Sequence, residues 1–172
     1  FNSEEVIKGI KEKISSLTTE KAVWIKEFIS GLSQAFQTVE KIEKSTESFT
    51  KDLLYLNNMA LAFPFLIQAY KLKADEKTIN RLTRLLENIT FRYLLRGGRA
   101  EIESRLNHFL VHLNSIESID KNINDIIWNI KNSDWCSYWS NYTMNQYLSG
   151  YFYKNRVDNY FLWKYELYLG NE

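Results

Sequence analysis

The sequence predicts an all-α fold, an irregular multi-helix bundle with long N-terminal helices and an aromatic-rich C-terminal helical part. Apolar residues recur at alternating spacings of three and four along most of the chain, the period of a helix that buries one face. Strand-like alternation between turn residues is nearly absent. One proline and six glycines among 172 residues leave long helices with few interruptions.

Two helices are expected at the N-terminal end. The apolar stripe of the first is Ile7, Ile10, Ile14 and Leu17. Ser15-Ser16 and Thr18-Thr19 then weaken the helix and offer N-caps for the next one. The second stripe is longer: Ile25, Phe28, Leu32, Ala35, Val39 and Ile42. This seam is of the kind that packs along another helix. Gly31 lies beside it and either costs about 1 kcal/mol of helix propensity or permits a close helix crossing.

The middle of the chain is the most apolar part, from Phe49 to Tyr70. Asn57-Asn58 can turn the chain there, and Pro64 suits the first turn of a new helix. The next helix is expected from near Asp75 to Leu95. Acidic residues complement its N-terminal dipole, and Gly97-Gly98 ends it.

Three further helical segments are expected. One begins near Arg99, with the stripe Ile102, Leu106, Phe109, Leu113 and Ile116, and another has the stripe Ile119, Ile123, Ile126 and Ile130. Short helices and packed turns are expected from Trp135 to Tyr153. The last helix, near Arg156 to Leu169, is apolar on almost every side. It is therefore expected to be buried or covered by a further domain, with Trp163 as a buried anchor.

Length and composition suit one helical domain over residues 1–172, with a subdivision into 1–132 and an aromatic-rich 133–172 left open. Phe1 begins the sequence without an initiator methionine, so we expect a fragment of a larger protein.

The single cysteine, Cys136, indicates a reducing, cytoplasmic compartment. No apolar run approaches the roughly 20 residues of a membrane span, so no membrane partner is expected. The net charge of +1 excludes a strong global field that would draw the chain onto nucleic acid.

The best candidate site is a set of arginines on and after the predicted helix 75–95. Arg81, Arg84, Arg92 and Arg96 fall within about 120° of helical arc, and Arg99 follows the glycines. Guanidinium groups bind phosphates bidentately, so these five are candidates for nucleic-acid binding. The alternative is a solvated face, partly neutralised by the nearby acidic residues Glu87, Glu101 and Glu103.

Aromatic residues are concentrated after residue 127. They are Trp128, Trp135, Tyr138, Trp139, Tyr142, Tyr147, Tyr151, Phe152 and Tyr153. Such rings can stack on bases or hold a flipped base. They also bury large areas, and an aromatic-rich helical core is the favoured interpretation.

His108 and His112 lie four apart on a predicted helix, so both rings can face one metal ion. A glutamate directly after the first histidine is missing, because Phe109 stands there, and no third ligand is evident. A flanking or surface pair is therefore favoured, and no metal or other cofactor is expected.

Motifs of self-contained catalysis are missing from the sequence. It has no glycine-rich phosphate loop, no nucleophile elbow and no clustered carboxylates with a histidine partner. No catalytic residue is assigned, and the chain is not expected to be an enzyme on its own.

Three stretches carry a resemblance to a known family. The first is Phe63–Tyr70, followed by Ile89–Tyr93. The second is Asn107–Leu110. The third comprises Trp135–Trp139, Tyr153–Arg156 and Tyr160–Glu166. This order resembles the helical region of GmrSD-type modification-dependent restriction endonucleases and their relatives. The resemblance covers most of the chain after about Leu53, and the closing Leu-Trp-Lys-Tyr-Glu run is its most distinctive part.

In that family a ParB-like nucleotide-hydrolysing domain precedes the helical region and a His-Asn-His-type nuclease domain often follows it. The acidic, Gln- and Arg-bearing signature of the first is absent here, and neither His108 nor His112 follows a Glu as the second requires. The resemblance therefore implies a non-catalytic scaffold and interaction domain of a prokaryotic phage-defence nuclease. Its implied partners are the neighbouring nuclease domains of the same parent chain.

Two other interpretations stay open. One is a DNA-binding module that uses the arginines from Arg81 to Arg99 and the C-terminal aromatics. The other is an autonomous enzyme that uses His108 and His112. DNA and a second copy of the chain likewise stay open as partners.

Overall fold

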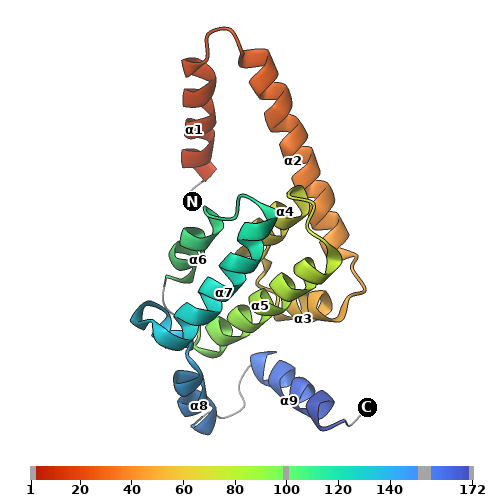
Figure 1. Ribbon diagram of the computed structural model, residues 1–172, viewed down its shortest axis with the longest axis vertical. Helices are drawn as coiled ribbons and strands as arrows, with labels where there is room; N and C mark the ends of the chain where they lie inside the picture. The colour runs from red at the N-terminus through yellow and green to blue at the C-terminus, as the bar shows by residue number, and fades with distance from the viewer. Residues whose placement is uncertain (1–2, 99–100, 151–155, 171–172) are drawn as a thin grey trace. The chain divides into compact units, whose positions relative to one another are not determined.

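The structure is a computed structural model that describes residues 3–98, 101–150 and 156–170, with only the backbone for residues 3, 134–136 and 156. The described residues form α-helices and two short 3-10 segments, and none of them lies in a strand (Figure 1). The predicted all-α, multi-helix fold is confirmed. No helix among them has both the length and the hydropathy to cross a bilayer.

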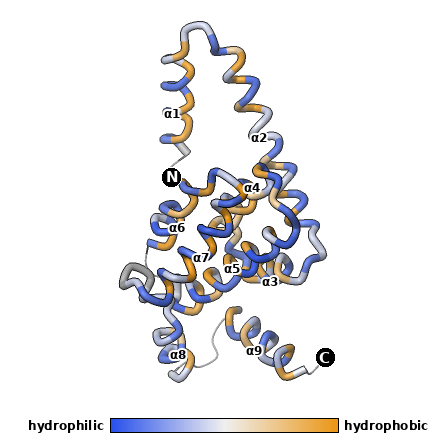
Figure 2. Tube along the Cα trace, viewed as in Figure 1, coloured by the Kyte–Doolittle hydropathy of each residue, from blue (hydrophilic) through white to orange (hydrophobic). Residues whose placement is uncertain are grey.

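The chain divides into two compact units, residues 1–40 and 41–172. The division lies inside helix α2 (Lys21–Glu43), whereas the subdivision considered from the sequence lay at residue 132. The first unit consists of α1 (Ser3–Ser16) and most of α2, joined by a turn. Both helices lie where the apolar stripes predict them. Figure 2 shows the recurring hydrophobic positions along the two helices.

The core of the second unit is built around α5 (Glu76–Leu95). This helix packs against α3 (Ser48–Leu56), α4 (Phe63–Lys71) and α7 (Ile116–Asn132). The buried residues of α5 are Leu82, Thr83, Leu85, Leu86, Ile89, Thr90 and Leu95. Burial of these residues holds α5 in one orientation. The polar side chains of α5 therefore point in fixed directions, away from the core.

The ends of the central helices follow the local signals in the sequence. Asp75 caps α5 by accepting a hydrogen bond from the Thr78 amide at 2.8 Å. Asn57 ends α3 in the left-handed region at φ 53°, before the 3-10 turn η1 (Met59–Leu61). Pro64 lies in the first turn of α4, and Gly97 and Gly98 follow α5 with positive φ, as predicted.

One predicted helix ends early. The stripe from Ile102 to Ile116 suggested a continuous helix, but α6 (Ile102–Leu110) ends before Val111. Ser115 then starts α7, because its side chain and that of Ser118 cap each other's backbone amides. Leu113 is still buried, and its carbonyl accepts a bond from Gln68 Nε2 at 2.9 Å. Ile116 is exposed at the start of α7.

After α7 come a 3-10 segment, η2 (Asp134–Trp139), and the short helix α8 (Asn141–Ser149), in line with the short helices and packed turns predicted there. The last helix, α9 (Arg156–Leu169), matches the predicted bounds. The prediction that Trp163 is a buried anchor is wrong within this chain, whereas coverage of α9 by a further domain stays a prediction. Trp163 is 45% exposed, because α9 packs on α3 and α5 and these two helices leave Trp163 partly uncovered, although Tyr160 on the same face is buried.

Candidate functional site

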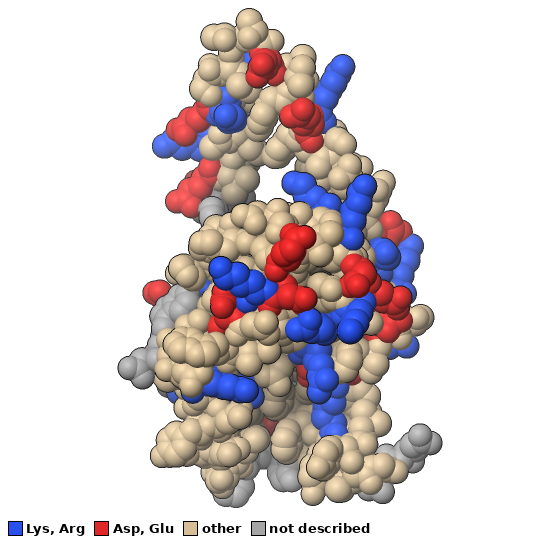
Figure 3. Space-filling view, viewed as in Figure 1, with Lys and Arg blue, Asp and Glu red and all other residues tan. Residues whose placement is uncertain are grey.

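A shallow hollow of about 570 Å³ lies among α3, α5, α7 and α9. Its lining residues are Phe49, Arg81, Arg84, Leu85, Glu87, Asn88, Ile123, Ile127 and Lys164. Three of these side chains are cationic, and the aliphatic residues give the hollow an apolar surface. Figure 3 shows basic and acidic side chains interspersed over the part of the second unit that faces the viewer, and the hollow itself is lined by Glu87 beside the three cations. The hollow is therefore a candidate binding site of mixed charge.

Arg81 and Arg84 reach this hollow from one side of α5 and are both exposed. Arg81 Nη1 donates to Asp120 Oδ1 at 2.5 Å, which ties α5 to α7. The Arg84 guanidinium lies over the Phe49 ring, 5.4 Å from its centroid. Of these two arginines, the described contacts give a carboxylate partner to Arg81 alone. Both side chains remain exposed to solvent, where they could bind an anionic group.

A polar network connects α9 to α3 and α5 beneath the hollow. The Tyr160 hydroxyl donates to the Glu87 carboxylate, and Lys164 Nζ donates to Asp52 Oδ2. Asp52 is 1% exposed, and its Oδ1 has no hydrogen-bond partner among the described residues. Burial raises the pKa of Glu87 above its ordinary value, against the lowering effect of the Tyr160 hydroxyl. Burial and the Glu87 carboxyl together raise the pKa of Tyr160.

Arg92 and Arg96 do not join Arg81 and Arg84 at the hollow, because they bind the C-terminal segment. Arg92 donates to the Trp139 carbonyl, and to the Asn88 and Asn141 side-chain oxygens at 2.7 Å each. Burial lowers the pKa of its guanidinium. Arg96 lies 4.3 Å from the Tyr147 ring centroid and 5.4 Å from that of Tyr138.

The predicted arginine set is therefore divided in space, and Arg99 lies outside the described residues. Nucleic-acid binding by these arginines stays a prediction. Sequence reasoning missed Lys164 and Asp120, which come from distant helices. A lysine on a helix as apolar as α9 was the one signal that could have pointed to Lys164.

His108 and His112 are both exposed on and just after α6. Their ring centroids are 5.4 Å apart, and His112 Nδ1 lies 2.8 Å from the His108 carbonyl oxygen. Within the described residues, no three histidine, cysteine, aspartate or glutamate side chains are grouped so that they could hold a metal ion. The geometry fits the surface pair favoured from the sequence.

The C-terminal aromatic residues divide between core and surface. Trp139 is buried in the main hydrophobic core, whereas Trp128, Tyr138 and Tyr142 are exposed. The Trp135 side chain and residues 151–153 lie outside the described part of the chain. Aromatic stacking on bases thus stays a prediction, and the core interpretation holds for Trp139.

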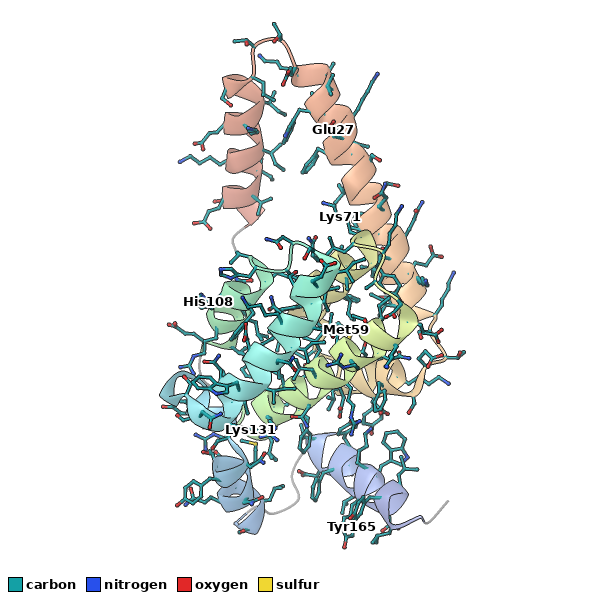
Figure 4. All side chains as sticks on the ribbon, viewed as in Figure 1. Glu27, Met59, Lys71, His108, Lys131 and Tyr165 are labelled. Atoms are coloured by element: carbon teal, nitrogen blue, oxygen red, sulfur yellow. The ribbon has the colours of Figure 1, made fainter. Side chains whose placement is uncertain are left out.

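Seven large apolar residues of α9 are exposed. We call this set the α9 apolar surface, and its residues are Phe161, Leu162, Trp163, Tyr165, Leu167, Tyr168 and Leu169. Tyr168 is 85% exposed. Figure 4 shows Tyr165 on the part of α9 that points away from α3 and α5. Val157 and Tyr160, near the start of α9, are by contrast buried.

Comparison with known proteins adds no relative. No family model, no curated protein and no solved structure matches this chain. The resemblance to GmrSD-type restriction endonucleases is neither supported nor opposed by this result, and it stays a prediction.

Proposed function

We propose that the chain is a non-catalytic helical scaffold and interaction domain of a prokaryotic phage-defence endonuclease of the GmrSD-like kind. In this proposal it works in the cytoplasm, where it orients the catalytic domains of the same parent protein. Its contact with those domains is the α9 apolar surface.

The observation that carries the proposal is the exposure of this surface on a firmly anchored helix. Seven large apolar side chains of α9 are exposed, although the helix is bound to the core through Tyr160 and Lys164. Clusters of exposed apolar side chains can mark interaction sites in folded proteins. Aromatic residues in particular dominate the centres of protein interfaces, because they bury large areas at low conformational cost. A protein domain is therefore the partner whose chemistry fits α9 best.

The direct experiment is a calorimetric titration of the chain with the flanking domains of its parent, purified separately. Tyr168→Glu places a charge in the α9 apolar surface, so it should weaken binding about tenfold or more. Asn159→Glu is the matched control, because Asn159 is an exposed polar residue of the same helix. It should bind as the unaltered chain does, and both variants should keep the unfolding midpoint. Unaltered binding by Tyr168→Glu, or no binding by the original chain, would refute the assignment.

A DNA-binding module is the second candidate function. The exposed arginines Arg81 and Arg84 and the ammonium of Lys164 border one hollow, and this favours contact with a phosphate backbone. The acidic partners Asp120 and Asp52 offset two of these three charges. The scaffold function is preferred for that reason.

A further inference from the structure

A second hollow, of about 670 Å³, lies in the second unit, where the connection from α2 to α3 meets the connection from α4 to α5. We call it the lysine hollow. The charged side chains that line it are Lys41, Lys44, Lys73, Glu47 and Glu76. Its volume falls within the range of small-molecule sites, roughly 300–1,000 Å³. It shares no lining residue with the hollow beside α9, so it is a separate candidate site.

The lysines reach this hollow from two parts of the chain. Lys41 and Lys44 lie at the end of α2, and Lys41 Nζ is 4.5 Å from the centroid of the Tyr70 ring of α4. Lys73 comes from the connection between α4 and α5. No ion pair of Lys41 or Lys73 is among the described contacts. These two charges are therefore open to an anionic ligand.

The backbone around Lys73 fixes where that side chain begins. Lys73 is in the left-handed region at φ 59°. Its amide donates to the Tyr70 carbonyl at 2.9 Å, and the Ala74 amide donates to the Ala69 carbonyl at 3.1 Å. These two bonds form a helix-ending motif whose left-handed residue is usually glycine. A glycine would thus suit the fold at this position, whereas the ammonium of a lysine suits an anion.

The start of α3 adds backbone donors beside the hollow. Glu47 precedes this helix, but its side chain makes no capping hydrogen bond. The Lys51 amide donates to the Glu47 carbonyl at 3.0 Å, as the first bond of the helix. The amides of Ser48, Phe49 and Thr50 have no acceptor among the described residues. Free amides at a helix start attract anions, and the helix dipole acts in the same direction.

Thr50 supplies an independent sign of a ligand. It lines the lysine hollow, and only 7% of it is exposed. Its hydroxyl takes part in none of the hydrogen bonds described for the chain. A buried hydroxyl without a partner costs free energy, which a hydrogen bond to a molecule in the hollow recovers.

The lining groups also indicate the chemistry of the ligand. Ammonium and backbone amide groups bind phosphate oxygens. The carboxylates of Glu47 and Glu76 repel phosphate, but they accept hydrogen bonds from hydroxyl groups, as does the carboxamide oxygen of Asn80. Burial, Glu76 and Glu47 together raise the pKa of Tyr70, so its phenol stays protonated and can donate. The hollow therefore suits a ligand with an anionic end and a hydroxyl-bearing end.

We propose that the lysine hollow binds a small phosphate monoester that carries hydroxyl groups. Its phosphate contacts the lysines, the start of α3 and the Thr50 hydroxyl, and its hydroxyl groups contact Glu47 and Glu76. The site lies apart from the α9 apolar surface and does not depend on the function proposed above.

The test is isothermal titration calorimetry of the 172-residue chain at low ionic strength, with glycerol 3-phosphate as the probe. The chain should bind it saturably. Lys73→Gly removes one ammonium and should weaken binding about fivefold or more. Because glycine is favoured at a positive φ, the same variant should keep or raise the unfolding midpoint. This combination separates a ligand-binding role of Lys73 from a structural one.

Two further variants complete the design. Thr50→Val removes the buried hydroxyl while keeping the shape of the side chain, and it should also weaken binding. Lys71→Gln is the matched control, because Lys71 is exposed at the end of α4 and does not line the hollow (Figure 4). It should bind as the unaltered chain does. Circular dichroism should show equal helix content in all three variants.

The possible results decide the proposal. Binding that Lys73→Gly and Thr50→Val weaken and Lys71→Gln leaves unchanged supports it. Absence of saturable binding, or equal weakening by all three variants, would overturn it. Inorganic phosphate should bind more weakly than glycerol 3-phosphate, and equal affinity would overturn the hydroxyl-bearing end. A DNA duplex that binds more tightly than glycerol 3-phosphate, and that Lys73→Gly releases, would overturn the small ligand in favour of a nucleic-acid backbone.

Discussion

At the scale of single residues, the contacts of Asp52 and Glu87 decide how α9 is held. Asp52 is buried on α3 and its charge is balanced by Lys164, which comes from α9. Glu87 is on α5 and accepts the Tyr160 hydroxyl from the same helix α9. Asp52 is buried and Glu87 is half-buried. The partner of Asp52 is 112 positions away along the chain, and the partner of Glu87 is 73 positions away. Neither partner can be inferred from sequence spacing.

The first prediction concerns the buried pair. Lys164→Met should destabilise the chain by about 2–3 kcal/mol, because it leaves the Asp52 carboxylate without a counter-charge. This loss of unfolding free energy is smaller than the loss on breaking a fully buried ion pair, since the Lys164 side chain is 30% exposed. Urea unfolding measures it. Asp52→Asn in the same chain should recover part of the loss, and Lys131→Met at an exposed site should have little effect. Equal midpoints for Lys164→Met and Lys131→Met would contradict this account.

The second prediction is a pH dependence. Burial raises the pKa of Glu87, so the folded chain keeps a proton that the unfolded chain has already released. The stability supplied by this group is complete below the ordinary glutamate pKa, and it is lost as the pH rises through the raised folded value. Glu87→Gln keeps an acceptor for Tyr160 and should remove this part of the slope, as urea midpoints at several pH values would show.

Glu117 is the matched contrast. Its pKa is lowered by hydrogen bonds from its own backbone amide and from the Ser115 side chain. The contribution of Glu117 to stability is therefore lost as the pH falls, whereas that of Glu87 is lost as the pH rises. A Glu87→Gln variant with the same pH profile as the original chain would rule out a shifted Glu87.

At the scale of elements, sequence periodicity predicts where helix α9 begins and ends, but the burial of its side chains depends on tertiary packing. The sequence places its bounds correctly, and apolar residues around its whole circumference suggested burial. The chain supplies only α3 and α5 as neighbours, so Val157 and Tyr160 are buried and Trp163 is not. Likewise, the stripe through Leu113 and Ile116 could not show that Ser115 restarts the helix, because the cap competes with continued periodicity.

The third prediction ranks two aromatic residues of α9. Tyr160 is 2% exposed and contacts both Tyr55 and Phe91, with ring centroids 5.9 and 5.7 Å away. Tyr160→Ala should therefore cost about 3–5 kcal/mol, the range for large aromatic residues in a core. Trp163→Ala should cost clearly less, because Trp163 is 45% exposed in the folded chain. Thermal unfolding of the two variants compares them. A larger loss for Trp163→Ala would restore the buried-anchor interpretation.

At the scale of the whole molecule, helical periodicity and capping residues were enough to predict the fold class and most helix bounds. They could not predict which polar side chains meet, because those pairs join α5 to α7 and α3 to α9 across long sequence separations. The arginines of α5 illustrate this limit. One face of a helical wheel holds Arg81 and Arg92, yet one reaches Asp120 and the other binds the Trp139 carbonyl.

The fourth prediction tests the DNA-binding alternative. Affinity for a DNA duplex should be weak, and it should fall with salt along a shallow slope, because the hollow exposes few cations that lack a carboxylate partner. Arg84→Glu should weaken any binding more than Arg92→Gln, since the Arg92 guanidinium is bound to protein oxygens. Fluorescence anisotropy at several salt concentrations measures both. Tight binding with a steep salt slope that Arg84→Glu abolishes would favour the DNA-binding module.

The α9 apolar surface is the proposed contact with the other domains of the parent protein. Hydroxyl-radical footprinting reads the solvent exposure of its side chains directly, in the chain alone and in the proposed parent protein. Tyr168 and Trp163 should be labelled strongly in the isolated chain, in keeping with their exposure. In the parent they should be protected, while the exposed Tyr142 of α8 serves as an internal reference. Equal labelling of Tyr168 and Trp163 in both proteins would contradict the claim.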